Sequence, residues 1–164
     1  MARKSLGDLF LHDLSDIYSA EKQLTRALAR LSRAASNEEL SKAFETHLHE
    51  TEGQIERIDK VVEVCGLRLK RMKCAAMEGL IEEGQEMIDE MGKGPVLDAG
   101  LVGAAQKVEH YEIAAYGTLC AIGKLLGRDE AVRLLSETLE EEKATDLKLS
   151  KFAQTVGNPQ AQEA

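Results

Sequence analysis

Apolar residues recur along most of this chain at alternating steps of three and four, the spacing that places them on one face of an α-helix. We predict a first helix that begins at Ser5, which forms a capping-box pattern with Asp8, and ends at about Ala35. One acidic residue, Glu21, interrupts its otherwise apolar stripe. The stripe consists of Phe10, Leu14, Ile17, Glu21, Leu24, Leu28 and Leu31.

A second helix is predicted from a cap at Ser36, with Glu39 at capping-box distance, to a stop at Gly66. Its inward face is more polar than that of the first helix. Glu50 follows His47 by three residues and therefore shares its side of the helix. The stripe consists of Leu40, Phe44, His47, Thr51, Gln54, Ile58, Val61 and Cys65.

The next segment, residues 67–94, is a long connection that contains a shorter helix of its own. The sequence GKGP at 92–95 ends that helix, and Pro95 suits the first turn of another long one, which Gly127 stops. The stripe of this long helix consists of Leu101, Ala105, Val108, Glu112, Ala115, Leu119, Ile122 and Leu126.

The last predicted helix follows a cap at Asp129. Its stripe consists of Val132, Leu135, Leu139, Glu142, Asp146, Leu149 and Ala153. The polar tail, residues 155–164, is expected to be disordered. Short, long and short connections thus join two helical hairpins, which predicts an all-α, ferritin-like four-helix bundle with one long crossover that contains an additional helix. We expect a single domain over residues 1–164.

Composition and charge exclude several functions. The 164 residues carry a net charge of −8, which disfavours nucleic-acid binding, because that function rewards clustered Lys and Arg. No apolar run has the length of a signal peptide or a transmembrane span, so a soluble, cytoplasmic protein without membrane contact is expected. The odd set of Cys65, Cys74 and Cys120 lacks metal-site spacing and indicates free thiols in a reducing compartment.

Four glutamates occupy positions where a bundle normally buries leucine. Glu21 and Glu50 are separated by 50 − 21 = 29 positions, and Glu112 and Glu142 by 142 − 112 = 30, so two matched hairpins bring all four to one level. Desolvation and mutual repulsion would raise the pKa of each carboxyl group. Either the groups share protons, or cations neutralise them. Two divalent metal ions bridged by carboxylates satisfy the second alternative.

The remaining ligands of such a site are left open by the sequence. The Glu-x-x-His pattern of many carboxylate-bridged metal sites is absent, because Gly53 and Thr145 stand at the histidine positions. An oxygen-dominated site favours Mn or Fe over Zn or Cu. The candidates for completing it are Gln54, Asp146 and Glu109, each of which lies within about one turn of a core glutamate.

Three nearby side chains have two interpretations each. His47 is either a ligand or a core histidine that is hydrogen-bonded to a carboxylate. Tyr18 and Tyr116 lie one turn from Glu21 and Glu112 respectively, and either orient these glutamates through their hydroxyls or serve as core aromatics.

Several segments of the chain resemble the YciF-type bacterial stress proteins: YSAEKQL (18–24), HETEGQIERI (49–58), MKCAAMEGL (72–80), KVEHYEIAAYGTL (107–119) and ETLEEEKATDLKL (137–149). The resemblance implies a ferritin-like fold related to rubrerythrin and manganese catalase, a homodimer and a cytoplasmic role in stress. Carried over from the rubrerythrin pattern, Glu21 fits the first ligand and Glu109 with Glu112 fits Glu-x-x-Glu. Glu50 and Glu142 fit the Glu-x-x-His positions without their histidines.

Two functional hypotheses follow. In the first, a dinuclear Fe or Mn site in the bundle core reacts with peroxide or oxygen, as a di-metal oxidoreductase of the peroxidase, catalase or ferroxidase kind. In the second, the protein is a non-enzymatic dimeric stress or scaffold protein whose core carboxylates share protons without metal. The sequence does not name catalytic residues.

Overall fold

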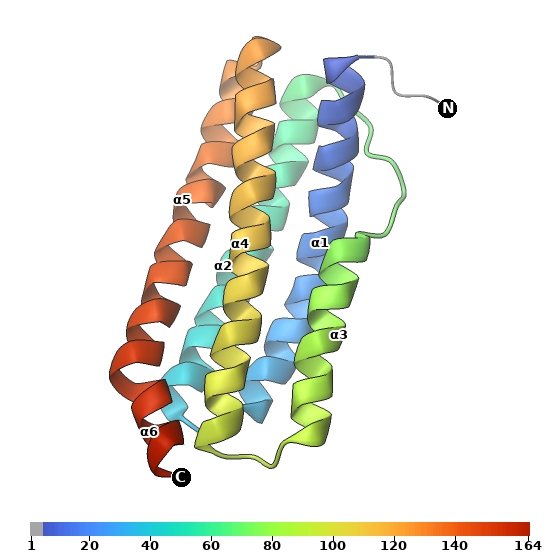
Figure 1. Ribbon diagram of the computed structural model, residues 1–164. Coiled ribbons are helices and arrows are strands. Elements are labelled where there is room, and N and C mark those ends of the chain that lie inside the picture. The colour runs from blue at the N-terminus through green and yellow to red at the C-terminus, as the bar shows by residue number, and fades with distance from the viewer. Residues whose placement is uncertain (1–4) are drawn as a thin grey trace.

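The structure, a computed structural model that describes residues 5–164, is a bundle of four long helices with a fifth helix packed along its outside (Figure 1). This arrangement confirms the predicted all-α bundle. The long helices are α1 (Leu6–Ala34), α2 (Glu38–Cys65), α4 (Pro95–Leu125) and α5 (Asp129–Phe152), and the outer helix is α3 (Ala75–Glu90). Within the described part of the chain, no helix is both long enough and apolar enough to cross a lipid bilayer.

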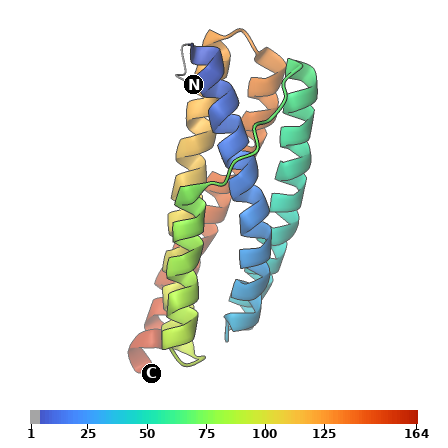
Figure 2. The ribbon, with the colours of Figure 1, turned by 90° about the vertical axis from the view of Figure 1, so that its right-hand side faces the viewer.

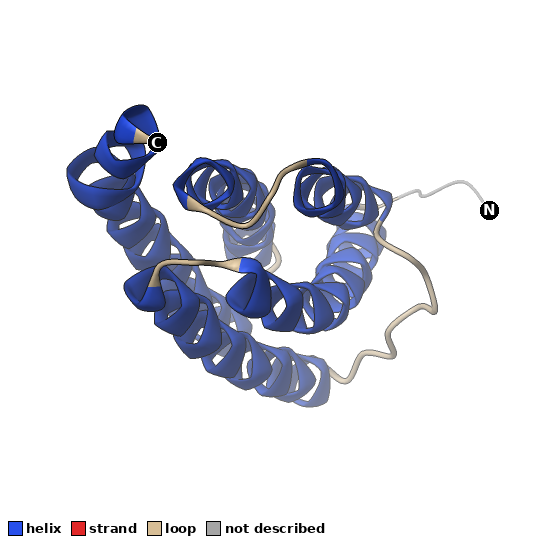
Figure 3. Cartoon of the chain, turned by 90° about the horizontal axis from the view of Figure 1, so that it is seen from below, coloured by secondary structure: helices blue, strands red, loops and turns tan. Residues whose placement is uncertain are grey.

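The four long helices form a closed ring around one core. Helix α1 packs against α2 and α4, and α5 packs against α2 and α4, so each helix has two neighbours within the ring. Viewed along the bundle, α3 lies outside the ring beside α1 and α4 (Figure 3). The centre of the bundle is therefore enclosed by one face from each of the four long helices.

The crossover between α2 and α3 runs along the outside of α1 (Figure 2). It starts at Gly66, whose φ of +60° ends α2 in the left-handed conformation that favours glycine. Two side chains one turn apart on α1 then hold the connecting loop. Ser15 Oγ accepts a hydrogen bond from the backbone N–H of Lys70, and Ser19 Oγ accepts one from the backbone N–H of Cys74. The long connection is thus fixed to the bundle by α1.

The apolar stripes of the sequence form the core. All seven stripe positions of α1 are buried, and so are the first seven of α2. In α5 the match is less complete, because Leu139 and Asp146 are only half-buried. The periodicity therefore predicts which face of each helix turns inward, with the largest deviations in the last helix.

Two boundaries and the tail differ from the sequence prediction. Asn37, not Ser36, caps α2 by accepting from the backbone N–H of Leu40, and α5 already includes Asp129 as its first residue. The predicted disorder of residues 155–164 is wrong, because the chain continues as a π-helical turn, Ala153–Gly157, and a short helix α6, Asn158–Glu163. The tail packs against α4, although most of its polar side chains stay exposed to solvent.

Asp98 explains the position of the α2 cap. Its carboxylate, buried in the first turn of α4, accepts hydrogen bonds from the backbone N–H groups of Ser36 (2.7 Å) and Asn37 (2.8 Å). The α1–α2 turn is therefore held by a residue more than sixty positions away. The capping-box pattern reflects only neighbouring residues and takes no account of this distant contact. The cap predicted from it, Ser36, is therefore one residue too early.

We predict that Asp98→Ala lowers the free energy of unfolding by about 3 kcal/mol, because it leaves two backbone N–H groups without their charged acceptor. Chemical denaturation followed by circular dichroism measures the change. The matched control is Asp59→Ala at an exposed position of α2, which is expected to alter stability by less than about 0.5 kcal/mol. Equal effects of the two substitutions would contradict a structural role for Asp98.

Candidate metal centre

Four buried side chains meet in the middle of the bundle. One potential ligand atom from each of His47, Glu109, Glu112 and Glu142 lies within 4.8 Å of the corresponding atom of every other member. We call these residues the core cluster. Helix α2 supplies the histidine, α4 supplies two glutamates one turn apart, and α5 supplies the third. Three of the four ring helices thus bring oxygen and nitrogen donors to one place.

His47 connects the core cluster to the edge of the bundle. Its Nε2 lies 2.9 Å from Glu109 Oε1 and 3.8 Å from Glu142 Oε2, and its Nδ1 lies 3.3 Å from Glu50 Oε2. Burial by itself lowers the pKa of this imidazole, but the hydrogen bonds to Glu109 and Glu50 outweigh it and raise the pKa well above the ordinary value. These contacts with carboxylates therefore favour the protonated, positively charged form of the imidazole.

Glu21, from α1, extends the core cluster through its contact with Glu112. The Tyr116 hydroxyl donates a hydrogen bond to Glu21 Oε1 at 2.5 Å, and both side chains are fully buried. Burial raises the pKa of Glu21, although hydrogen bonds with Glu112 and Tyr116 lower it in part. All four ring helices therefore contribute to a continuous buried group of polar side chains.

The buried glutamates resist ionisation. Burial raises the pKa of Glu112 well above its usual range, and repulsion from Glu21, Glu142 and Glu109 raises it further. Burial likewise raises the pKa of Glu142, together with its contact with Glu109. In the absence of a cation, holding these groups ionised costs free energy.

Most of the carboxylate oxygens of the buried glutamates accept no hydrogen bond from the described residues. Buried polar atoms normally have hydrogen-bond partners, so a concentration of unsatisfied acceptors in one place requires an explanation. Those without a donor are Glu21 Oε2, Glu109 Oε2, both oxygens of Glu112 and both oxygens of Glu142. Acceptor oxygens that converge without donors fit the coordination of one or more hard cations.

The other predicted ligands lie elsewhere. Glu50 was expected at the same depth as the other glutamates, but its side chain is 32% exposed and bonds to His47 and to the Thr145 hydroxyl at 3.4 Å. Asp146 points out of the seam, where it contacts Gln106 Nε2 at 3.2 Å and His110 Nε2 at 3.3 Å. Glu50 therefore lies at the edge of the site, and Asp146 pairs with α4 instead of facing the core cluster.

Gln54 is fully buried, and its amide is held by a hydrogen bond to a carboxylate that is not part of the core cluster. Its Nε2 donates to Glu141 Oε2 at 3.0 Å, and Arg57 binds the same carboxylate through two guanidinium nitrogens. Gln54 Oε1 is buried without a donor. Tyr18 is half-buried, with the Lys22 ammonium 4.5 Å from its ring centre. Coordination by Gln54 and glutamate orientation by Tyr18 remain predictions.

Sequence reasoning underrated two contributors. Glu109 was only one of several candidates, yet its side chain is 1% exposed and contacts His47 directly. Thr145 occupies the histidine position of the Glu-x-x-His pattern that starts at Glu142, but it is not among the predicted site residues. That position was the available signal, because residues three apart on a helix point to the same side.

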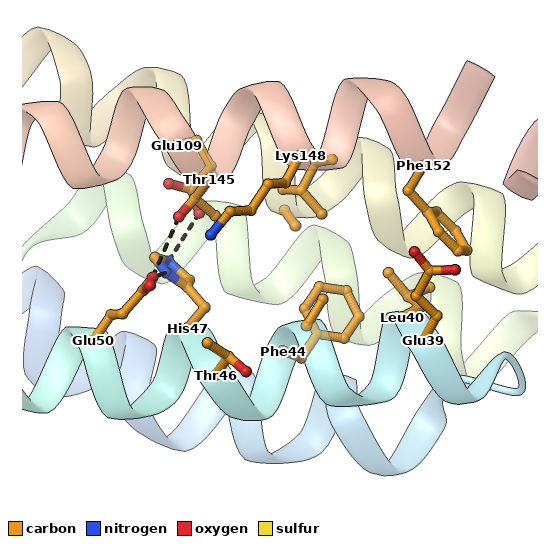
Figure 4. Close-up of a pocket in the computed structure, with 13 residues that line it drawn as sticks. Glu39, Leu40, Phe44, Thr46, His47, Glu50, Glu109, Thr145, Lys148 and Phe152 are labelled. Atoms are coloured by element: carbon orange, nitrogen blue, oxygen red, sulfur yellow. Dashed lines mark hydrogen bonds and ion pairs between the residues drawn. The ribbon is translucent and has the colours of Figure 1, made fainter. Parts of the chain in front are cut away.

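A pocket reaches the core cluster from the surface between α2 and α5 (Figure 4). Its volume is about 240 Å³. His47, Glu109, Glu50 and Thr145 lie at one end, and apolar side chains including Phe44 line the other. The candidate centre is therefore buried but not sealed.

Comparisons with known proteins bear on the family and the fold of this chain. Residues 5–162 match the family described as Domain of unknown function (DUF892). Protein YciF of Escherichia coli K12 is 64% identical over 154 residues, which cover 93% of each chain. The crystal structure of the E. coli stress protein YciF superposes with a TM-score of 0.90, covering 92% of this chain and 96% of that one.

Two further solved structures are similar. YcfI of Rhodopseudomonas palustris, provisionally described as a structural protein, is 47% identical, with a TM-score of 0.87 over 90% of this chain and 94% of that one. A protein of Xanthomonas campestris pv. campestris is 19% identical, with a TM-score of 0.73 over 93% of each chain. The latter similarity supports the fold alone.

We predict that the metal-free protein loses stability as pH rises above about 4.3, the pKa of glutamate in the unfolded chain. Folding raises the pKa of Glu112 and Glu142, so the unfolded chain releases their protons at lower pH than the folded chain does. The stabilising difference is present below the unfolded pKa and disappears as pH rises through the folded pKa. The raised pKa of His47 acts in the same direction. Thermal unfolding in the presence of a chelator measures the effect.

The variant Glu112→Gln is expected to lose less stability over this range and to unfold at a higher temperature than the unmodified protein at the alkaline end. A gain of about 1 kcal/mol corresponds to about 2–4 °C for a domain of this size. Glu82→Gln, at an exposed position of α3, is the matched control and should follow the unmodified protein. A melting temperature that rises with pH would contradict the assignment of these shifts.

Proposed function

This chain belongs to the family described as Domain of unknown function (DUF892), and we propose that it is a stress-response protein whose buried glutamates bind a pair of iron or manganese ions. The role in stress rests on similarity to the E. coli stress protein YciF. The metal centre rests on one observation above the others, the set of buried carboxylate oxygens without donors around Glu112 and Glu142.

The chemistry of the donors fits hard divalent cations. Carboxylate oxygens outnumber the single imidazole, which favours Mn(II) or Fe(II) over softer or more nitrogen-loving metals. Glu109, Glu112 and Glu142 would hold one ion, and Glu21 with Glu112 offers oxygens for a second. Such a pair would supply reversible electron transfer to a small oxidant, peroxide or oxygen.

The protein itself would orient the ligands and exclude water. The hydrogen bond from Tyr116 occupies Glu21 Oε1 and leaves Oε2 without a donor. Glu21 and Glu112 are fully buried, so the oxygens that they offer lie away from solvent, where electrostatic interactions are stronger than in water. These residues therefore hold the carboxylates in place, and the metal ions would carry the electrons.

A proton route would accompany this chemistry. Glu50 is partly exposed and bonds to His47 Nδ1, while His47 Nε2 faces Glu109 Oε1. A proton taken up at Glu50 can pass through the imidazole, which releases it from its opposite nitrogen toward the core cluster. Reduction of peroxide consumes protons, so this connection would meet a requirement of the proposed reaction.

The second candidate is a metal-free structural protein in which the glutamates share protons. The provisional structural description of the R. palustris relative favours it, as does the short hydrogen bond between Tyr116 and Glu21. In that case replacing Glu21 and Glu112 with glutamine would leave stability unchanged or raise it, with no dependence on metal. Assembly as a homodimer is compatible with both candidates and remains an expectation from the resemblance.

Metal binding is tested directly. Protein purified without chelator should contain Fe or Mn by elemental analysis, and titration of the metal-free protein with Mn(II) should give saturable binding by calorimetry. We expect Glu142→Gln to weaken affinity by about 100-fold or more, because outer ligand contacts alone are worth 10–100-fold. Glu140→Gln, exposed on the same helix, is the matched control. Negligible metal content together with no uptake would remove the proposal.

Reaction with an oxidant is a separate prediction. Fe(II)-loaded protein should oxidise on addition of hydrogen peroxide with about one peroxide consumed per two ions, as a paired site requires. Stopped-flow spectroscopy with a ferrous-iron chelator assay measures rate and stoichiometry. Glu142→Gln, at matched total iron, should react no faster than iron in buffer. Binding of metal without any faster oxidation would restrict the centre to a structural role.

A further inference from the structure

The pocket beside the core cluster is larger and more apolar than a small inorganic oxidant needs. Its volume is about 240 Å³, whereas one water molecule occupies about 30 Å³ in the liquid. Hydrogen peroxide has only two non-hydrogen atoms. A space of this size, open to the surface and ending at His47 and Glu109, has room for an organic group of roughly ten non-hydrogen atoms.

We propose that this pocket binds small apolar hydroperoxides, with the organic group against Phe44, Leu149 and Phe152 and the hydroperoxyl group beside His47 and Glu109. The inference names a substrate class for the proposed metal centre, and its reactive part rests on that proposed function. The alcohol that would result from reduction has the same organic group and a similar polar head. It therefore binds in the same place.

One end of the pocket is apolar and the other is polar, as an apolar molecule with a polar head group requires. Leu40, Phe44, Leu149 and Phe152 are all buried and form an apolar end drawn from α2 and α5. Burying an organic group of the size of an aromatic side chain there is favourable by about 25 cal/mol per Å² of apolar surface. Hydrogen peroxide cannot use this surface.

The other end offers donors and acceptors together. The Lys148 ammonium reaches over the pocket toward Glu50 and His47 (Figure 4). Glu109 is 1% exposed, and its Oε2 receives no N–H or O–H donor from the described residues. A neutral head group that both donates and accepts, such as a hydroxyl or hydroperoxyl, satisfies these partners.

The reaction balances without further reagents beyond the divalent pair. The O–O bond of the hydroperoxide breaks, and an alcohol and a water molecule form. Two protons would enter along Glu50 and His47 from solvent, and the two electrons would come from the ions of the proposed centre. No other oxidant or reductant is needed for a single turnover.

Binding is tested on the metal-free protein with an unreactive alcohol, 2-phenyl-2-propanol, by NMR titration. We expect saturable shifts confined to residues that line the pocket, with a dissociation constant at or below about 1 mM. Ala43→Phe, at an exposed position on the rim of the pocket, should weaken binding about tenfold or more by occupying the apolar space. Ala76→Phe, exposed on α3, is the matched control.

Three outcomes decide the inference. Loss of alcohol binding in Ala43→Phe, with Mn(II) affinity and fold unchanged, supports it. No saturable binding of the alcohol to the unmodified protein overturns it and leaves metal uptake unaffected. Alcohol binding without any metal uptake keeps the pocket assignment but removes the hydroperoxide reaction, so the two failures are distinguishable.

Discussion

Four glutamate side chains lie in the middle of this bundle with almost no access to water, in a place where carboxylates are costly to ionise. The cost is visible as raised pKa values for Glu21, Glu112 and Glu142, for each of which burial is the largest cause. His47 offsets part of the charge, and one imidazole is too little to balance the group. Bound cations or shared protons must do the rest, and the structure is arranged around this requirement.

The fold keeps the carboxylates together by distant contacts more than by local ones. Each of the four ring helices contributes a polar side chain to the centre, so displacement of any one helix would separate donors from acceptors. Asp98 fixes the turn between α1 and α2 from the start of α4, and Ser15 and Ser19 fix the crossover against α1. These tethers connect the hairpins and limit relative sliding.

Polarity changes in steps from the centre of the bundle to its surface. Glu112 is sealed, His47 is buried but bonded outward, and Glu50 is partly exposed at the wall of an apolar pocket. This order separates the tasks that the proposed chemistry needs, with charge neutralisation inside, proton transfer through the imidazole and binding of an organic group outside. The first step involves α4, whereas His47 and Glu50 lie on the same side of α2.

The sequence by itself determined the helices, the two-hairpin topology and the presence of buried glutamates, because apolar spacing is a local property of the chain and three of the four predicted glutamates are fully buried. Tertiary packing decided which acidic residues are innermost. Glu109 and Glu50 both lie near a contact line between helices. The rotation of each helix against its neighbours buries Glu109 and leaves Glu50 partly exposed. Glu109 lies three residues from Glu112, and Glu50 lies three residues from His47. Residues three apart share one side of a helix, so periodicity alone does not show which member of each pair lies deeper.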